Sequence, residues 1–126
     1  MLNKLATLVG VIFLVIGVLG FVPAATTNGM LLGLFHVNVW HNIVHLVTGL
    51  VALSAGCGCC GVCSISQWTP KLFFQAFGII YGAVAVLGFY YGNEALFGVI
   101  ANNFADSVLH AGIAVVSLYL GFVYKE

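Results

Sequence analysis

The stretch Leu34–Leu53, LFHVNVWHNIVHLVTGLVAL, decides the fold, because it is an apolar run of membrane-spanning character that carries several polar side chains. In a helix, residues three, four and seven positions apart return to the same face. Four polar residues of the stretch have this spacing: Asn38, His41, Asn42 and His45. Because unpaired polar groups in hydrocarbon cost several kcal/mol, this face has to contact protein instead of lipid.

The composition of the whole chain is that of an integral membrane protein. Of its 126 residues, 63% are hydrophobic and 5% are charged, against roughly 25% charged residues in soluble domains. The 16 glycines fit helices that pack closely in a membrane. The formal net charge of zero argues against nucleic acid as a partner. We expect a single integral domain over residues 1–126, with the lipid bilayer as its surroundings.

Four apolar segments predict an all-α bundle of four transmembrane helices. The expected spans are about 5–22, 35–55, 72–91 and 102–123. The first is about 27 Å long as a helix, close to the roughly 30 Å of a hydrocarbon core. Residues 23–33 are rich in turn formers and predict a short exposed connection. Pro70 is suited to open the third helix.

Two helical hairpins of similar sequence make up the chain. The corresponding segments are Gly10–Phe13 with Gly78–Tyr81, Val18–Phe21 with Val86–Phe89, Leu34–Phe35 with Leu96–Phe97, and His41–His45 with Asp106–His110. Each unit has an even number of spans, so the units are predicted to be parallel repeats about an axis near the membrane normal. Because the first helix has a spanning counterpart, we interpret it as a span and not as a cleaved signal peptide.

The lysines predict the orientation. Lys4, Lys71 and Lys125 lie on the same side of a four-span protein, and they are its only basic residues other than histidine. Cytoplasmic segments carry an excess of Lys and Arg. We therefore expect the N-terminus and the C-terminus to be cytoplasmic.

The fourth helix repeats the polar pattern of the second. Asn103, Asp106, His110 and Ser117 share one of its faces, and Ser107 follows Asp106. The pairs His41/His45 and Asp106/His110 lie at similar depths in the outer half of the bilayer. We expect these pairs to meet across a contact between the second and fourth helices, supported by Asn38, Asn42, Asn103 and Ser107.

A structural role is the leading interpretation of this polar set. Buried Asp, Asn and His side chains form interhelical hydrogen bonds worth about 0.6 kcal/mol each on average. The protein then acts as a structural or accessory component of the membrane, in a homo-oligomer or a larger complex, and not as an enzyme.

Metal or pigment binding is the alternative. Three imidazoles and a carboxylate on facing helices, His41, His45, Asp106 and His110, suit zinc or another transition metal. A haem or chlorophyll held by His45 and His110, with Gly49 and Gly112 making room, is a further interpretation. The third function class is a metal-dependent hydrolase with Asp106 or His41 as base and Ser107 close by.

Cysteines form a separate feature between the second and third spans. Cys57, Cys59, Cys60 and Cys63 occupy a cytoplasmic loop in this topology, where thiols stay reduced. Such a loop suits soft-metal binding or acylation, or simply a tight turn of small residues.

Three motifs carry a resemblance to a known family. They are HNIVHLVTG in the second helix, ADSVLH in the fourth, and VLGF at the ends of the first and third. Over nearly its whole length, the chain resembles an uncharacterised family of small bacterial four-helix membrane proteins, known only as a domain of unknown function. Its most specific residues here are Asn42, His45, Gly49, Asp106 and His110. The resemblance implies a bacterial inner (plasma) membrane protein with HNxxH and DxxxH motifs and no assigned activity.

Overall fold

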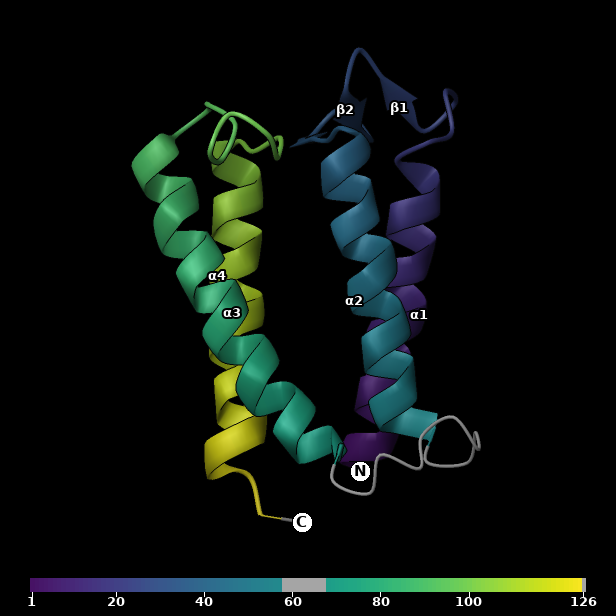
Figure 1. The fold of residues 1–126 in the computed structure, drawn as a ribbon, viewed down its shortest axis with the longest axis vertical. Helices are drawn as coiled ribbons and strands as arrows, with labels where there is room; N and C mark the ends of the chain where they lie inside the picture. Colours follow the sequence, from purple (N-terminus) through teal and green to yellow (C-terminus); the bar gives the residue numbers. More distant parts are fainter. Residues whose placement is uncertain (58–67, 126) are drawn as a thin grey trace.

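Four helices make up most of the computed structural model, which describes residues 1–57 and 68–125 (Figure 1). They are α1 (Leu2–Leu19), α2 (Val39–Cys57), α3 (Pro70–Tyr91) and α4 (Phe104–Leu118), and α4 continues as the π-helix η2 (Tyr119–Val123). Each of the four, with η2 counted in the last, is long and apolar enough to cross a membrane. The predicted four-helix membrane bundle is confirmed.

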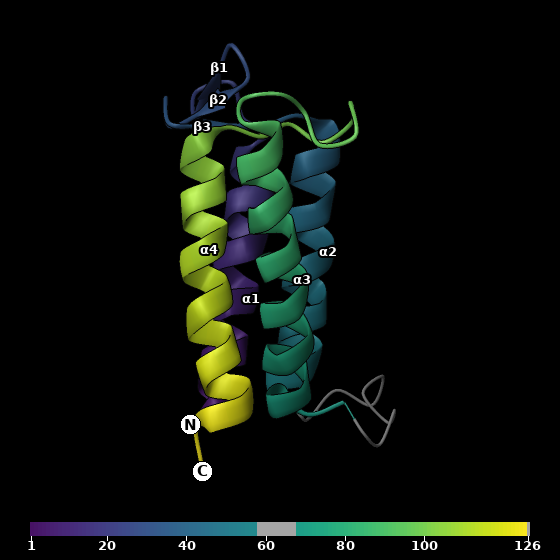
Figure 2. The same ribbon diagram turned by 90° about the vertical axis from the view of Figure 1, so that its left-hand side faces the viewer.

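The helices pair as two hairpins, α1 with α2 and α3 with α4. In Figure 1 the start of α3 leans toward the α1–α2 hairpin, at the end of the molecule that carries both chain termini. Seen from the side, α3 and α4 lie in front of α1 and α2 (Figure 2). The histidine-bearing helices α2 and α4 therefore belong to different hairpins.

Glycines allow the two helices of each hairpin to approach closely. A Cβ atom on Gly10 of α1 would lie 2.9 Å from the carbonyl oxygen of Gly49 on α2 and 2.7 Å from Leu53. In the other hairpin, a Cβ atom on Gly78 would lie 2.8 Å from the backbone nitrogen of Leu118. Close backbone contact of this kind is how small residues stabilise helix pairs in membranes.

Aromatic side chains join the hairpins in the interior. Phe13 of α1 makes edge-to-face contacts with Phe77 and Tyr81 of α3, at ring-centroid distances of 5.5 and 5.7 Å. All three side chains are at most 7% exposed. They belong to the main buried cluster of the described residues, which also includes Phe73 and Phe74.

Side chains fix where the helices begin. The Thr69 hydroxyl accepts a hydrogen bond from the backbone N–H of Leu72 at 3.2 Å, and Pro70 is the first helical residue. The prediction for Pro70 is thus confirmed. Asn103 caps α4 in the same manner. Such caps satisfy backbone N–H groups that lack an intrahelical partner.

The connection between α1 and α2 differs from the expected one. It contains a small antiparallel sheet in the order β1 (Thr26–Thr27), β2 (Met30–Leu31), β3 (Phe35–His36). The second helix begins at Val39 and not at residue 35, because the Asn38 side chain accepts the backbone N–H of His41 at 2.9 Å and so caps the helix. The first helix occupies Leu2–Leu19 instead of 5–22.

The two connections share a tight-turn conformation. Leu32 and Gly33 have φ angles of 53° and 70°, Phe97 and Gly98 have φ angles of 53° and 72°, and Asn28 and Gly29 have φ angles of 52° and 73°. A glycine at positive φ fixes the turn in each case. The expected correspondence of Leu34–Phe35 with Leu96–Phe97 stays a prediction.

Replacing Gly10 by valine should loosen the α1–α2 hairpin. The added side chain meets the Gly49 backbone, and overpacking of this kind costs about 1–3 kcal/mol. Thermal unfolding of the detergent-solubilised protein measures the loss. Gly112→Val is the matched control, because no described atom lies within 4 Å of a Cβ at Gly112. Equal melting temperatures for the two variants would contradict the close approach of α1 and α2.

Candidate functional site

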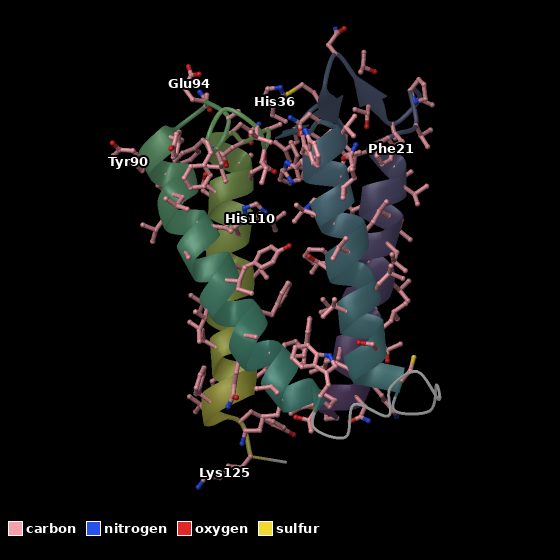
Figure 3. All side chains as sticks on the ribbon, viewed as in Figure 1. Phe21, His36, Tyr90, Glu94, His110 and Lys125 are labelled. Carbon is pink, nitrogen blue, oxygen red and sulfur yellow. The ribbon has the colours of Figure 1, made fainter. Side chains whose placement is uncertain are left out.

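Three histidines from the two hairpins converge. One nitrogen atom from each of His41 and His45 on α2 and His110 on α4 lies within 4.8 Å of the other two. The ring centroid of His41 is 4.5 Å from that of His45 and 6.2 Å from that of His110. Figure 3 shows His110 projecting from α4 toward the α1–α2 hairpin. We call these three side chains the histidine cluster.

His41 is held in place from the opposite hairpin. Its Nδ1 atom lies 2.8 Å from the carbonyl oxygen of Ala101, and the backbone of His36 lies beside the same ring. A neutral imidazole that donates from Nδ1 to a carbonyl keeps a lone pair on Nε2. The Ala101 contact thus selects the tautomer that suits a ligand role for His41.

His45 and His110 each have a buried nitrogen atom that forms no hydrogen bond with another described residue. Within the described residues, Nδ1 of each is buried and has no hydrogen-bond partner. Leaving a buried donor or acceptor unpaired costs about 1–3 kcal/mol, so such atoms in a native structure call for an explanation. Hydrogen bonding within the described residues therefore does not account for these two nitrogen atoms.

Asp106 is not part of the histidine cluster. The backbone N–H of Asn103 donates to its carboxylate at 3.2 Å, and the Asn103 side-chain oxygen accepts the N–H of Asp106 at 2.9 Å. This is a capping box at the start of α4. The backbone of His36 also faces the carboxyl group. The spacing Asn-x-x-Asp before an apolar run was the sequence signal for this role.

Asn38 and Asn103 link the hairpins through reciprocal hydrogen bonds. The amide of Asn38 donates to the carbonyl oxygen of Val99 at 2.7 Å. The amide of Asn103 donates to the carbonyl oxygen of Leu34 at 2.9 Å. Each asparagine therefore caps its own helix with its oxygen and bonds to the connection of the other hairpin with its nitrogen.

Ser107 and Asn42 lie beside the cluster without joining it. The Ser107 hydroxyl, which is fully buried, lies 3.3 Å from Asn102 Oδ1 and 3.1 Å from Asn103 O. It is thus bonded to the connection between α3 and α4 and not to an imidazole. Asn42 packs against Gly20, where an added Cβ would collide with the Asn42 amide.

Asn102 is a residue that sequence reasoning missed. Its amide donates hydrogen bonds to the carbonyl oxygens of Gly88 and Gly92 at the end of α3.

The remaining predicted residues have other positions. Gly49 packs against Leu14 and the Gly10 backbone, so it makes no room for a macrocycle, whereas a Cβ at Gly112 would have no described atom within 4 Å. His36 is exposed. Cys57 is half-buried as the last residue of α2, and Cys59, Cys60 and Cys63 lie outside the described residues.

An apolar groove adjoins the histidine cluster between α1 and α4. We call it the α1–α4 groove; its volume is about 760 Å³. Its polar lining residues among the described part of the chain are His45, Asp106, His110 and Ser117. The open side of the cluster therefore faces a space that apolar side chains enclose.

A family model, Domain of unknown function (DUF4383), matches residues 3–123. The chain belongs to this family. No curated protein and no solved structure matches it. The family membership confirms the resemblance to an uncharacterised family, and the four apolar helices make this DUF4383 protein a small membrane protein.

Asn103→Ala should destabilise this DUF4383 protein by about 2 kcal/mol, because it removes both the cap of α4 and the bond to Leu34. Asn103→Ser should lose about half as much, since serine keeps a capping oxygen but has no amide to donate. Unfolding in detergent measures both losses. Equal losses in the two variants would show that the cap of α4 contributes nothing, and no loss in either would exclude both bonds as stabilising contacts.

Proposed function

We propose that this DUF4383 protein binds a divalent transition-metal ion, with zinc as the first candidate, through His41, His45 and His110. The observation that carries the proposal is the convergence of three imidazole nitrogens, from two separate hairpins, within 4.8 Å of one another. Imidazole is a common ligand of zinc, copper, nickel and iron.

The distances are compatible with an ion after a small adjustment. Three atoms within 4.8 Å of one another share a central point no more than about 2.8 Å from each, whereas a zinc–nitrogen bond is about 2.0–2.1 Å. Each ring therefore has to shift by less than about 1 Å to close on an ion. Rotation about side-chain torsions provides shifts of this size.

Three histidines also leave a coordination position open. His45 and His110 both line the α1–α4 groove, so the fourth position of a tetrahedral ion would face it. Asp106 does not complete the set, because its carboxylate caps α4. The ligand set supported here is thus three imidazoles, and not the three imidazoles and a carboxylate expected from the sequence.

The purely structural interpretation accounts for fewer of the observations. It explains Asn38, Asn103 and Asp106, which all have hydrogen-bond partners. It does not explain why His45 and His110, whose Nδ1 atoms have no partner among the described residues, converge with His41. A flat tetrapyrrole is less compatible than an ion, since the His41 ring lies 4.5 Å from that of His45 and Gly49 is packed against α1.

We also propose that the protein lies in a bacterial inner membrane with both termini in the cytoplasm. Support comes from the positions of the lysines. Lys125 lies at one end of the molecule and Glu94 at the other (Figure 3), and Figure 1 marks both termini at the end of Lys125. Lys4 and Lys71 lie in the first turns of α1 and α3, which begin at the same end (Figure 1).

The metal proposal predicts about one zinc or cobalt ion per chain, measured by elemental analysis and by the absorption of bound cobalt(II). His45→Ala and His110→Ala should each weaken binding at least about tenfold, because each removes one of three ligands. Binding should weaken as the pH falls, since only neutral imidazoles bind metal.

Two variants serve as controls for this experiment. His36→Ala removes an exposed histidine outside the cluster, and Asp106→Asn removes the carboxylate charge. Both should keep the affinity within about twofold of the parent protein, because neither residue contributes a ligand atom. If zinc and cobalt do not bind the parent protein, or bind His45→Ala equally well, the metal proposal is wrong and the structural interpretation of the histidines stands.

The orientation proposal predicts the behaviour of C-terminal fusions. Green fluorescent protein fused after Glu126 should fluoresce, and alkaline phosphatase at the same position should be inactive, because the latter needs export to form its disulfides. The opposite pair of results would place the C-terminus outside the cytoplasm.

A further inference from the structure

The α1–α4 groove extends along most of the membrane-spanning length of the molecule. Leu31 and Leu32, in the connection that carries the strands, line one end, and Leu5 and Leu120 line the other. Between them the walls are apolar side chains of the two helices, including Ile12 and Ile113. The shape therefore suits a long hydrocarbon chain, not a compact solute.

The charge of the lining excludes one class of head group. Among the described residues that line the groove, none is Lys or Arg, and one, Asp106, carries a carboxyl group. Phosphate and carboxylate groups are recognised in proteins by cationic side chains and charge-assisted hydrogen bonds. A phospholipid or a fatty acid would therefore meet no cation there, and a neutral molecule is favoured.

The polar atoms of the groove indicate what the head group contains. The imidazoles of His45 and His110 both line the groove, and no side-chain hydrogen bond to another described residue accounts for either of them. A neutral imidazole has one donor and one acceptor nitrogen. Together they match a hydroxyl or carbonyl oxygen.

We propose that the α1–α4 groove binds a neutral, long-chain, lipid-soluble molecule whose hydroxyl or carbonyl oxygen forms hydrogen bonds with His45 and His110. Its hydrocarbon tail lies along α1 and α4. The proposal applies to the metal-free protein, in which the groove and the two imidazoles are present; an ion bound to the same imidazoles would compete with the lipid oxygen.

Photo-crosslinking of chelator-treated protein in phosphatidylcholine nanodiscs tests the proposal without any metal. The probes are diazirine-bearing hexadecanol, palmitate and hexadecane, which share one chain and differ in the head group. We expect the hexadecanol probe to label α1 and α4 with at least about tenfold higher yield than the other two, because a built hydrogen-bonding site rejects ligands that cannot pair with it.

Two variants of α4 provide the matched comparison. Gly112→Phe fills the groove, since Gly112 lines it and no described atom lies within 4 Å of a Cβ there. Val115→Phe adds the same side chain at a position that is 69% exposed and does not line the groove. We expect Gly112→Phe to reduce hexadecanol labelling about tenfold and Val115→Phe to leave it within about twofold.

Three results would overturn the proposal. One is equal labelling by palmitate or hexadecane, which would remove the selectivity for a neutral oxygen. Another is unchanged labelling in Gly112→Phe. The third is a change of oligomeric state in Gly112→Phe and not in Val115→Phe, which would assign the groove to a second copy of the chain. Zinc binding by His41, His45 and His110 is measured separately, so either proposal can fail alone.

Discussion

The structure depends on hydrogen bonds made by asparagine side chains at the N-terminal ends of α2 and α4. In each hairpin one asparagine, Asn38 or Asn103, caps its own helix and bonds to the backbone of the other hairpin. The capping oxygens satisfy backbone N–H groups that have no partner within the helix. The two hairpins are thus tied together beside the histidine cluster, and His41 strengthens the connection through Ala101.

Much of the architecture is predictable from the sequence because it follows from hydropathy and helical periodicity. The four spans, the role of Pro70 and the convergence of His41, His45 and His110 can all be deduced from the spacing of apolar and polar residues. The position of a polar side chain on a helix predicts that it points into the bundle, since a polar face in hydrocarbon has to contact protein. The spacing does not predict which residue that side chain contacts there.

Asp106 shows this limit. It shares a helical face with His110, and on spacing alone it pairs with the imidazoles. Its position three residues after Asn103 places it in the first turn of α4, where the backbone N–H groups compete for a carboxylate. The carboxylate of Asp106 therefore bonds to the N-terminus of α4 and not to an imidazole. Asn38, which was expected on the polar face of the second helix, caps α2 for the same reason. The strands β1–β3 could not be predicted, because each has only two residues and so shows no periodic pattern.

The reciprocal caps have a consequence for biogenesis. While the first hairpin is in the bilayer alone, the Asn38 amide and the Leu34 carbonyl lack the partners, Val99 and Asn103, that the second hairpin brings. The early half of the chain is therefore incomplete as an inserted unit and gains its final stability only when synthesis of the late half ends. A chain that ends after the first hairpin thus lacks both of these bonds and also the contact of His41 with Ala101.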